Sequence, residues 1–545
     1  GQCGNQVGSA FWPLALHEYG IQTTSSGVNL LKVQRNHVKH VNDLSHAFPS
    51  FFHVPNAADN LHFQDIADLN KAKVKARAVL VDMEDSVVSR FKQGPLRQLF
   101  DQTCIVTNYP GSANNWAIGY YEHGRKHQDR LEESVRRTVE KCDRLHGFLL
   151  LYSLGGGTGS GLGTATLKLL KDNYPHVERI VSCVYPANTR DTITAPYNAL
   201  LATRELIEHA TCVFPVENKA LLDICNAQMK RENTGQMNYN ASCRPFQDMN
   251  SIVVNMLLHL TSGSRFPGSL NMDMNEVATN LVPYSKLHYV FSSISPATLS
   301  ASDMCTMQET KYLDSVFLSC SSLTCFHVKF IYRYCHLRLQ DELFINAWSR
   351  NNQLIKLDPL QPTSVVLAAA HIARGNTTLS DMKRNIERFQ NKSKFTSWSR
   401  DCMKIGLCSI PPAGHSSSLL CLLNSSAMSL LFRDIIQEFS KLYRKKAHVH
   451  HYTQVHGFEE THFTESREDI LSLCECYAEI RSMEETNIPR LQTLFLTELA
   501  PGSLSGALGA FMASSRKLAS SSKARSSPSA SSSAASSSSS ISGIP

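Results

Sequence analysis

The sequence predicts an α/β fold in which a mostly parallel sheet is covered by helices on both faces. Over the first 220 residues, short β-branched or apolar runs alternate with longer helical patterns, as in strand–helix–strand units. A glycine-rich loop joins one of these runs to a helical pattern, and one long apolar helix follows the alternation. The expected strands cover 76–82, 104–107, 148–154, 180–185 and 211–216, and the expected helices include 128–145, 197–209 and 248–260.

The composition is that of a soluble globular protein. The 545 residues suffice for two or three domains, and 42% of them are hydrophobic and 19% charged. No apolar run approaches the roughly 18 to 20 residues of a membrane span, and no signal peptide is visible. The 16 cysteines are scattered from Cys3 to Cys476, which indicates reduced thiols and a cytoplasmic protein. With a net charge of +7 and no nucleic-acid motif, neither nucleic acid nor membrane is expected as a partner.

Shifts in composition divide the chain into regions. The α/β alternation predicts a nucleotide-type domain, the apolar helix a connection to a mixed α/β domain, and charged amphipathic patterns a helical region. A stretch rich in Cys, Ser and aromatic residues is expected to be an insertion, and the Ser- and Ala-rich end to be disordered. The expected boundaries are 1–242 for the nucleotide-type domain, 243–262 for the connecting helix, 263–410 for the intermediate domain with the insertion at 303–338, 411–495 for the helical region and 496–545 for the tail.

The sequence Gly-Gly-Gly-Thr-Gly-Ser-Gly, from Gly155 to Gly161, stands between an expected strand and an expected helix. Glycines allow backbone N–H groups to approach a phosphate, and the helix start adds the positive end of its dipole. The alternative, a flexible linker, seldom lies between a buried strand and a helix. Leu162 follows where the common P-loop has lysine, and no acidic residue is placed for a dinucleotide. The loop is therefore predicted to bind phosphate through backbone amides and a cation.

A magnesium ion is expected to supply that cation, held in part by carboxylate. Asp82 and Glu84 end an expected strand, at the edge of an open α/β sheet where such ligands gather. The same two side chains could instead cap a helix that begins near Ser86.

The glycine motif is the signature of the tubulin superfamily, and the chain resembles that superfamily over roughly 1–300 and 339–490. The resemblance implies a tubulin-like fold: a Rossmann-like domain that binds GTP or GDP with Mg²⁺, a connecting helix, an intermediate α/β domain and C-terminal helices. Family members have a full strand ahead of the first motif, so the first strand of domain 1–242 is expected to be missing. The other matching segments, in order, are Gly1 to Gln6, Asp82 to Glu84, Gly111 to Trp116, Asp191 to Asn198, Asn218 and Phe246 to Asn250.

The resemblance implies a role for each matching residue. Asn218 and Asn250 would hydrogen-bond the guanine edge, and Phe246 would stack on the base, although such a pattern at the start of a buried helix is more often core. Most family members have a ribose-binding glutamate at the position of Ala195, so that contact is in question unless Asp191 or Thr194 replaces it. The residues expected around the nucleotide are Gln2, Cys3, Gln6, Asn114, Ser153, Gly156, Gly157, Thr158, Gly159 and Asp191, with Glu84 and Asp82 at Mg²⁺.

Segment 268–276 matches the part that family members extend onto the nucleotide of the next subunit in a protofilament. Glu276 matches a glutamate of alpha-tubulin and a lysine of beta-tubulin, which implies a catalytic role in trans, orienting the attacking water. Composition alone predicts an exposed helix residue. No water-activating residue stands beside the glycine loop, so hydrolysis of GTP to GDP is expected to depend on assembly. The alternative is a non-polymerising GTP-binding scaffold.

Softer features separate the branches of the superfamily. Leu270 to Glu276, Ala195, the histidines in 448–451 and the lack of an acidic tail resemble the epsilon branch, which implies a role in centriole and basal-body microtubule organisation. Another microtubule-forming isotype is the alternative. Expected partners are other tubulins, delta-, alpha- or beta-like, in head-to-tail contact, and centriolar or centrosomal proteins. The expected location is the cytoplasmic cytoskeleton, at the centrosome, centriole or basal body.

The His-rich segment 443–452 could bind a metal, but no acid or cysteine completes a site at helical spacing. A helix packed on the body of the protein, with its basic residues outward, is the preferred interpretation.

Overall fold

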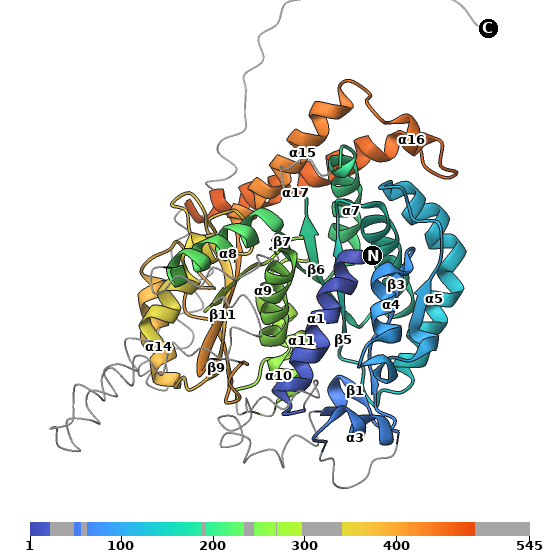
Figure 1. Ribbon diagram of the computed structural model, residues 1–545. Helices are drawn as coiled ribbons and strands as arrows, with labels where there is room; N and C mark the ends of the chain where they lie inside the picture. Colours follow the sequence, from blue (N-terminus) through green and yellow to red (C-terminus); the bar gives the residue numbers. More distant parts are fainter. Residues whose placement is uncertain are drawn as a thin grey trace, which may run out of the picture. The chain divides into compact units, whose positions relative to one another are not determined.

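The computed structural model describes residues 1–21, 48–55, 63–186, 192–233, 245–266, 268, 270–296, 340–413 and 415–485. Gly1–Thr486 form one unit and Asn487–Pro545 another, and every described helix and strand belongs to the first unit (Figure 1). Three sequence expectations lie outside the described residues: the insertion at 303–338, the tail at 496–545 and the role of Asp191.

Parallel strands form the first half of the fold, as the alternating pattern predicts. One sheet has the order β5-β6-β7, and β3 pairs with β4 in a second parallel group. The strands are β3 (Leu80–Asp82), β4 (Ile105–Thr107), β5 (Gly147–Ser153), β6 (Glu178–Tyr185) and β7 (Cys212–Glu217). The helices between them are α4 (Asp85–Gln93), α5 (Gly124–Val139), α6 (Gly163–Asn173) and α7 (Ala195–His209).

Helix α1 (Gln2–Glu18) begins between the two groups of parallel strands. Asn5 Nδ2 donates to the Val81 carbonyl in β3 at 3.1 Å. On the other side, a Cβ atom on Gly4 would lie only 2.0 Å from the Leu151 carbonyl oxygen in β5. The first turn of α1 is thus in contact with both β3 and β5, which belong to separate sheets.

The expected strand 76–82 is two strands in the structure. Lys75–Ala76 (β2) pairs antiparallel with Phe52–His53 (β1), whereas β3 pairs in parallel with β4. Between β2 and β3, the Arg77 N–H donates to the Phe51 carbonyl at 2.9 Å and continues the contact with the β1 segment. The prediction of one continuous strand is wrong because the partner of β2 comes from a segment far upstream, which the local pattern does not encode.

The four-stranded sheet has the order β10-β9-β11-β8. β10 runs parallel to β9, while β11 is antiparallel to both β9 and β8. The boundary expected at residue 410 therefore cuts through a sheet, because β11 lies beyond it. Leu419 to Leu423 are buried, as a central strand covered on both faces requires. The strands are β8 (Phe291–Ser295), β9 (Val366–Gly375), β10 (Lys404–Cys408) and β11 (Ser417–Ser425).

Helix α9 (Pro245–Leu260) is the long apolar helix that the sequence predicts. Its side chains from Ile252 to Leu258 are buried on every side of the helix. The helix packs against α1 and α8 and against strands β8, β9 and β11 (Figure 1). A helix surface with so many apolar side chains has to be covered by protein, so the predicted burial is confirmed.

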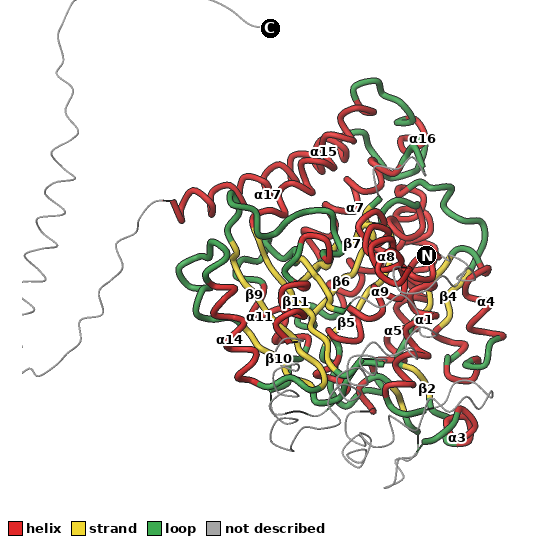
Figure 2. The backbone as a smooth tube through the Cα atoms, turned by 60° about the vertical axis from the view of Figure 1, so that its left-hand side comes forward, coloured by secondary structure: helices red, strands yellow, loops and turns green. Residues whose placement is uncertain are grey.

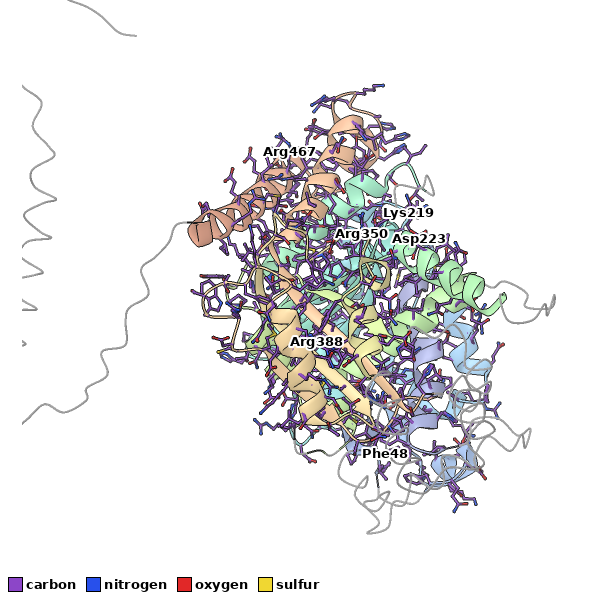
Figure 3. All side chains as sticks on the ribbon, turned by 90° about the vertical axis from the view of Figure 1, so that its left-hand side faces the viewer. Phe48, Lys219, Asp223, Arg350, Arg388 and Arg467 are labelled. Carbon is purple, nitrogen blue, oxygen red and sulfur yellow. The ribbon has the colours of Figure 1, made fainter. Side chains whose placement is uncertain are left out.

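Helix α8 (Asn218–Asn233) carries charged side chains on its exposed side. Lys219 and Asp223 are labelled on this helix in Figure 3. Asp223 Oδ2 lies 2.9 Å from Lys356 Nζ, and the two side chains are 56% and 42% exposed. This is a surface ion pair in water, which contributes little to stability.

A buried ion triad joins α1 to the four-stranded sheet. Glu18 Oε2 accepts from Arg265 Nη1 at 2.6 Å, and Glu18 Oε1 accepts from Arg374 Nη1 at 2.8 Å. Arg265 ends α10 (Ser262–Arg265), and Arg374 belongs to β9. Burial alone would raise the pKa of the Glu18 carboxyl, but the two guanidinium groups hold it below its usual range.

The C-terminal part of the unit is helical, as the charged amphipathic pattern predicts. Helices α15 (Ser429–Tyr443) and α17 (Thr461–Glu485) pack against each other and against α7 (Figure 2). The short helix α16 (His450–Thr453) stands between them in the chain. Within the described ranges, no helix combines the length and the apolar character needed to cross a bilayer.

Candidate nucleotide site and the face that carries Glu276

The glycines of the loop after β5 serve different purposes. A Cβ atom on Gly157 would lie 2.5 Å from the backbone nitrogen of Asn115, so only glycine fits there. A Cβ atom on Gly156 would meet nothing closer than Asn114 Oδ1, at 3.7 Å. Gly157 therefore packs directly against the backbone of Asn115, whereas one face of Gly156 is not covered by protein.

A helix begins within the glycine loop. Thr158–Leu162 form a short π-helical segment (η6), and α6 continues from Gly163. A Cβ atom on Gly161 would lie 2.3 Å from the Trp116 carbonyl oxygen, so this turn is also sealed. The start of a helix exposes unpaired backbone N–H groups with a positive dipole end, which favours an anion.

Loop 111–116 lies directly against the glycine loop. Ser112 Oγ is 3.0 Å from Thr158 Oγ1, so two hydroxyl groups meet between the loops. Ala113 and Asn114 adopt left-handed backbone angles, with φ of 45° and 55°. Non-glycine residues in this region are uncommon and concentrate at functional sites. This backbone directs the Asn114 side chain toward the uncovered face of Gly156.

Asn198 is the residue that connects these loops, although its place in the sequence predicted no role of its own for it. It is fully buried in the first turn of α7. Its Nδ2 donates to the carbonyls of Asn114 at 2.8 Å and Gly155 at 3.0 Å. Its Oδ1 accepts from the Trp116 N–H at 2.9 Å and the Tyr452 hydroxyl at 2.7 Å. One amide therefore fixes both loops and the C-terminal part relative to one another.

The first turn of α1 borders the glycine loop. A Cβ atom on Gly1 would lie 3.1 Å from the backbone nitrogen of Gly159. Gln2 is exposed here, while burial raises the pKa of the Cys3 thiol to about 11 and keeps it neutral near pH 7. Gln6 is half-buried one turn farther along the helix. Of the three predicted residues in α1, Gln2 and Cys3 are therefore the ones next to the loop.

The two carboxylates predicted as metal ligands lie in different surroundings. Asp82 is buried, which raises its pKa, and it accepts from Asn5 Nδ2 at 3.3 Å. Glu84 is exposed and accepts a hydrogen bond from Gln2 Nε2. Its Oε1 would lie 3.5 Å from a Cβ atom on Gly111. Glu84 is thus the carboxylate available beside the loop.

The alternative role for these carboxylates was helix capping. Glu84 does occupy the N-cap position of α4, but its side chain makes no capping hydrogen bond. In the described part of the chain, no three His, Cys, Asp or Glu side chains gather to hold a metal ion. The residues present therefore fit a magnesium ion only if phosphate oxygens and water supply most of its ligands, which is the usual arrangement for nucleotide-bound Mg²⁺.

The residues predicted to hold the base stand at the starts of α8 and α9. Asn218 directly follows β7, and Asn250 is half-buried one turn into α9. Phe246, in the first turn of α9, is 67% exposed. Helices α8 and α9 pack on each other. The exposed ring argues against the alternative that Phe246 is a core residue.

The position of the missing ribose glutamate is closed by a methyl group. Ala195 begins α7 and is buried, with its Cβ 3.9 Å from a Cβ atom on Gly155. Thr194 was one expected substitute, but its Oγ1 already donates to the Asn114 carbonyl at 2.9 Å. Its hydroxyl hydrogen is therefore not available to a ribose in this conformation.

Glu276 lies in the first turn of α11 (Met274–Leu281). Asp273 caps this helix, because its Oδ1 accepts from the Glu276 N–H at 2.8 Å, an interaction that stabilises a helix by about 1 kcal/mol. The preceding Met272 is buried, and a Cβ atom on Gly263 would lie 2.3 Å from its carbonyl oxygen. The Glu276 carboxylate pairs with Lys404 Nζ at 3.1 Å, a contact that the sequence did not reveal.

Glu276 and the glycine loop lie at opposite ends of β5. A Cβ atom on Gly147, which begins the strand, would lie 3.2 Å from Met274 Cε in α11. At the other end, a Cβ atom on Gly159 would lie 2.7 Å from the Ser153 carbonyl oxygen. A parallel strand of 7 residues is about 20 Å long, at roughly 3.3 Å per residue. Glu276 therefore cannot reach a phosphate at its own glycine loop.

The basic segment 443–452 packs beside the same loops. The Tyr197 hydroxyl donates to the Ala447 carbonyl at 2.7 Å, and Asn115 Nδ2 donates to the His451 carbonyl at 2.8 Å. The His451 ring itself is exposed. No metal-binding group of side chains forms in this segment, all of which is described. The preferred interpretation was a helix packed on the body with basic residues outward. The packing and the outward basic side chains agree with the structure, but residues 444–449 form turns between α15 and α16 instead of a helix.

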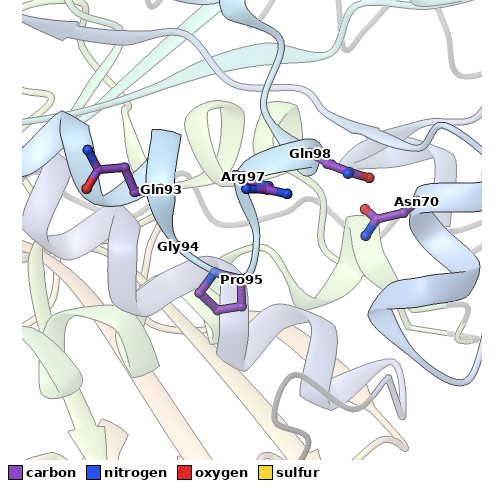
Figure 4. Close-up of a pocket in the computed structure, with 6 residues that line it drawn as sticks. All are labelled: Asn70, Gln93, Gly94, Pro95, Arg97 and Gln98. Atoms are coloured by element: carbon purple, nitrogen blue, oxygen red, sulfur yellow. The ribbon is translucent and has the colours of Figure 1, made fainter.

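A surface hollow of about 330 Å³ lies apart from these residues (Figure 4). None of the predicted nucleotide-binding residues lines it, and Arg97 is its one charged side chain, so it does not point to a particular ligand. It is lined by Asn70, Gln93, Gly94, Pro95, Arg97 and Gln98.

Comparison with known proteins supplies independent information on this fold and site. Residues 1–226 match the GTPase domain of the Tubulin/FtsZ family, and residues 334–437 match the Tubulin C-terminal domain. The chain is 40% identical over 513 residues to the Tubulin epsilon chain of Mus musculus and 39% identical over 513 residues to that of Homo sapiens. Both alignments cover 90% of this chain and 97% of the relative. Identity to the Tubulin alpha-3 chain of Saccharomyces cerevisiae is 31% over 491 residues, covering 88% and 96%.

Parallel strands, a glycine loop at a strand end and a helix that begins within it define an α/β protein of the nucleotide-binding class. The two matching domains and the identities over nine-tenths of the chain then identify the family: the chain belongs to the tubulin family. It is more similar to the two epsilon chains than to the yeast alpha chain. The resemblance found in the sequence is confirmed.

Proposed function

We propose that this chain binds GTP or GDP, together with Mg²⁺, at the loop between β5 and α6. The observation that carries the proposal is the contrast within the loop: Gly157 is sealed against Asn115, whereas Gly156 has only Asn114 Oδ1 nearby, at 3.7 Å. Such a loop leaves backbone N–H groups for an anion on one face only. The match of residues 1–226 to the tubulin GTPase domain supports GTP as the nucleotide.

Each matching residue has a role in this proposal. Glu84 is the exposed carboxylate available to Mg²⁺, with Asp82 behind it, and the bound ion would neutralise phosphate charge. Asn218 and Asn250 would hydrogen-bond the guanine edge, and Phe246 would cover the face of the base. The residues around the phosphates and ribose would be Gln2, Cys3, Gln6, Asn114, Ser153, Gly156, Gly157, Thr158, Gly159 and Asp191.

Hydrolysis would use a residue from a second subunit. Glu276 is separated from its own glycine loop by the length of β5, about 20 Å, which supports action in trans. Its carboxylate would accept a proton from the attacking water, while the water oxygen bonds to the γ-phosphorus and the bond to the β-phosphate oxygen breaks. GDP and inorganic phosphate would be the products. The reaction would then require head-to-tail contact with another tubulin, delta-, alpha- or beta-like.

The cellular role in this proposal rests on the similarity to the epsilon chains. The 40% identity to a Tubulin epsilon chain supports an epsilon-like role in organising centriole and basal-body microtubules. In this proposal the protein belongs to the cytoplasmic cytoskeleton at the centrosome, centriole or basal body, and centriolar or centrosomal proteins are further partners. The alternative is a GTP-binding scaffold that does not polymerise. The ion pair between Glu276 and Lys404 favours this scaffold alternative. In the single subunit the lysine occupies one carboxylate oxygen of Glu276, which a general base would need for the water proton.

A mixed assay tests the proposal. The full chain is added to a GTP-loaded partner tubulin, and phosphate release is compared between wild type, Glu276→Ala and Thr279→Ala at matched assembly. Thr279 is an exposed residue of the same helix and serves as the control. Wild type and Thr279→Ala should accelerate hydrolysis, while Glu276→Ala should lose that gain by roughly 10² to 10⁴. Equal hydrolysis with all three would favour the scaffold, and failure of the wild type to bind GTP would contradict the nucleotide site.

A further inference from the structure

Glu276 does not stand alone at its end of the subunit. Lys404, the first residue of β10, brings its Nζ to 3.1 Å from Glu276 Oε1, and the two side chains remain 27% and 42% exposed. The backbone fixes this arrangement, because the Leu407 N–H donates to the Leu270 carbonyl at 2.9 Å in an antiparallel bridge. Strand β10 and the segment before α11 are therefore joined, and an ammonium and a carboxylate lie side by side at the surface.

Asp273, the carboxylate at the start of α11, has partners of its own. Asp273 uses Oδ1 to cap α11, and its Oδ2 lies 3.8 Å from His146 Nδ1. Asp273 therefore does not compete with Glu276 for the lysine. Lys404 is the full positive charge that directly contacts Glu276.

The segments that flank this pair expose apolar side chains. Leu270 is 38% exposed, and Tyr284 and Trp398 are 46% and 44% exposed with their rings 6.3 Å apart. Partly exposed aromatic pairs are frequent anchors of protein interfaces. The segments that carry Glu276 and Lys404 therefore also expose side chains suited to contact another subunit.

An ammonium group binds phosphate oxygens at least as readily as it binds carboxylate oxygens, and a triphosphate carries more negative charge than one glutamate. In the single subunit Lys404 has Glu276 as its partner, and that contact engages an oxygen that a general base needs for the water proton. If Lys404 bound the docked nucleotide instead, the same movement would release the carboxylate of Glu276.

We propose that Lys404 is a second residue delivered in trans. On docking, its ammonium leaves Glu276 and binds a phosphate oxygen of the partner's GTP, and Glu276 is released to accept the proton of the attacking water. Lys404 transfers no proton itself; it stabilises the charge on the phosphates while the bond between the γ-phosphorus and the β-phosphate oxygen breaks. This inference rests on the proposed action of Glu276 in trans.

The experiment compares wild type with Lys404→Met, Lys404→Arg and Lys356→Met. Lys356 is the matched control, since it is also a partly exposed lysine paired with a carboxylate, at 2.9 Å from Asp223. Co-sedimentation measures the affinity of each for GTP-loaded and for GDP-loaded partner tubulin, and phosphate release is measured at matched assembly. Lys404→Met should lose preference for the GTP-loaded partner by roughly tenfold and also lose rate. Lys404→Arg should keep most of both, and Lys356→Met should match wild type.

The outcomes separate this inference from the proposed function. If Glu276→Ala lowers hydrolysis but Lys404→Met keeps both the preference and the rate of wild type, Lys404 has no role in trans. If Lys404→Met weakens binding to GTP-loaded and GDP-loaded partners equally and lowers the unfolding midpoint, the lysine is a structural tie, which also overturns the inference. If Glu276→Ala itself has no effect, the proposed reaction is what fails.

Discussion

The glycine loop can be tested by two substitutions that differ only in what the added methyl group would meet. In Gly156→Ala the nearest atom to the new Cβ would be Asn114 Oδ1 at 3.7 Å, an ordinary contact, and the backbone of Gly156 is not left-handed. In Gly161→Ala the new Cβ would lie 2.3 Å from the Trp116 carbonyl oxygen, inside the backbone of the neighbouring loop. The first change should leave the fold intact, and the second should destabilise it.

The expected magnitudes follow from these contacts. A methyl group at 156 would occupy the face where we propose that phosphate meets the backbone, so GTP affinity should fall tenfold or more, at least about 1.4 kcal/mol. Overpacking a sealed contact costs about 1 to 3 kcal/mol of unfolding free energy, which is the loss expected for Gly161→Ala. Gly157→Val belongs with the second change, because its Cβ would lie 2.5 Å from Asn115 N.

Each full-length variant is titrated with a fluorescent GTP analogue and unfolded in urea. Gly8→Ala is the matched control, since its Cβ would meet only Phe91 Cζ at 3.8 Å, and Gly8 lies inside α1, away from the loop. It should bind GTP as wild type does and be as stable or more stable, because alanine favours a helix interior over glycine by roughly 0.5 to 1 kcal/mol. The reasoning is refuted if Gly156→Ala and Gly8→Ala bind GTP with equal affinity.

Three further predictions concern the base, the buried ion triad of Glu18, and Asn198, the hub that connects the two loops. The amides of Asn218 and Asn250 match the guanine edge but not the adenine edge, so GTP should bind at least tenfold more tightly than ATP; equal titrations would contradict the assignment. Glu18→Gln should cost about 3 to 5 kcal/mol at pH 7, because it removes the buried carboxylate from two guanidinium groups, whereas Asp223→Asn at the exposed pair should cost at most about 1 kcal/mol. Since the folded pKa of Glu18 is lowered, the stability from its charge should be present above about pH 4.5 and lost below it; urea unfolding should show this slope reduced in Glu18→Gln. Asn198→Leu should remove four hydrogen bonds between the loops and weaken GTP binding, and unchanged hydrogen exchange in loop 111–116 would contradict its role as the hub.

Much of the fold could be predicted because local patterns leave few choices. The strand expected at 148–154 is Gly147–Ser153, and the helix expected at 197–209 is Ala195–His209. The first is a short apolar run that ends just before the glycine loop, and the second begins with a proline at its second position. Strand β11 was missed because five apolar residues, Leu419 to Leu423, fit a buried strand or a buried helix equally well. Its pairing with β9 and β8 comes from distant parts of the chain.

The same distinction applies to the site. Glycines that approach a neighbouring backbone leave a local signal, which is why the loop could be predicted. Asn198 bonds Tyr452, 254 residues away, and Lys404 pairs with Glu276 across 128 residues. One asparagine or one surface lysine carries no pattern that predicts such a partner. The ring of Phe246 shows the reverse case, since its sequence context favours a core residue and its 67% exposure does not.

The direction of the strands relates the two ends of the subunit. Because β5, β6 and β7 are parallel, the segments that follow them, including the glycine loop and Asn218, gather at one edge of the sheet. Helix α11, which carries Glu276, contacts the beginning of β5 and packs against β6 at the opposite edge. A second subunit stacked along the strand direction would bring its Glu276 to the first subunit's loop and leave its own loop free for a third. Such a contact joins unlike ends and repeats without closing. In the function that we propose, the topology that separates Glu276 from its own glycine loop would therefore also couple hydrolysis to linear assembly.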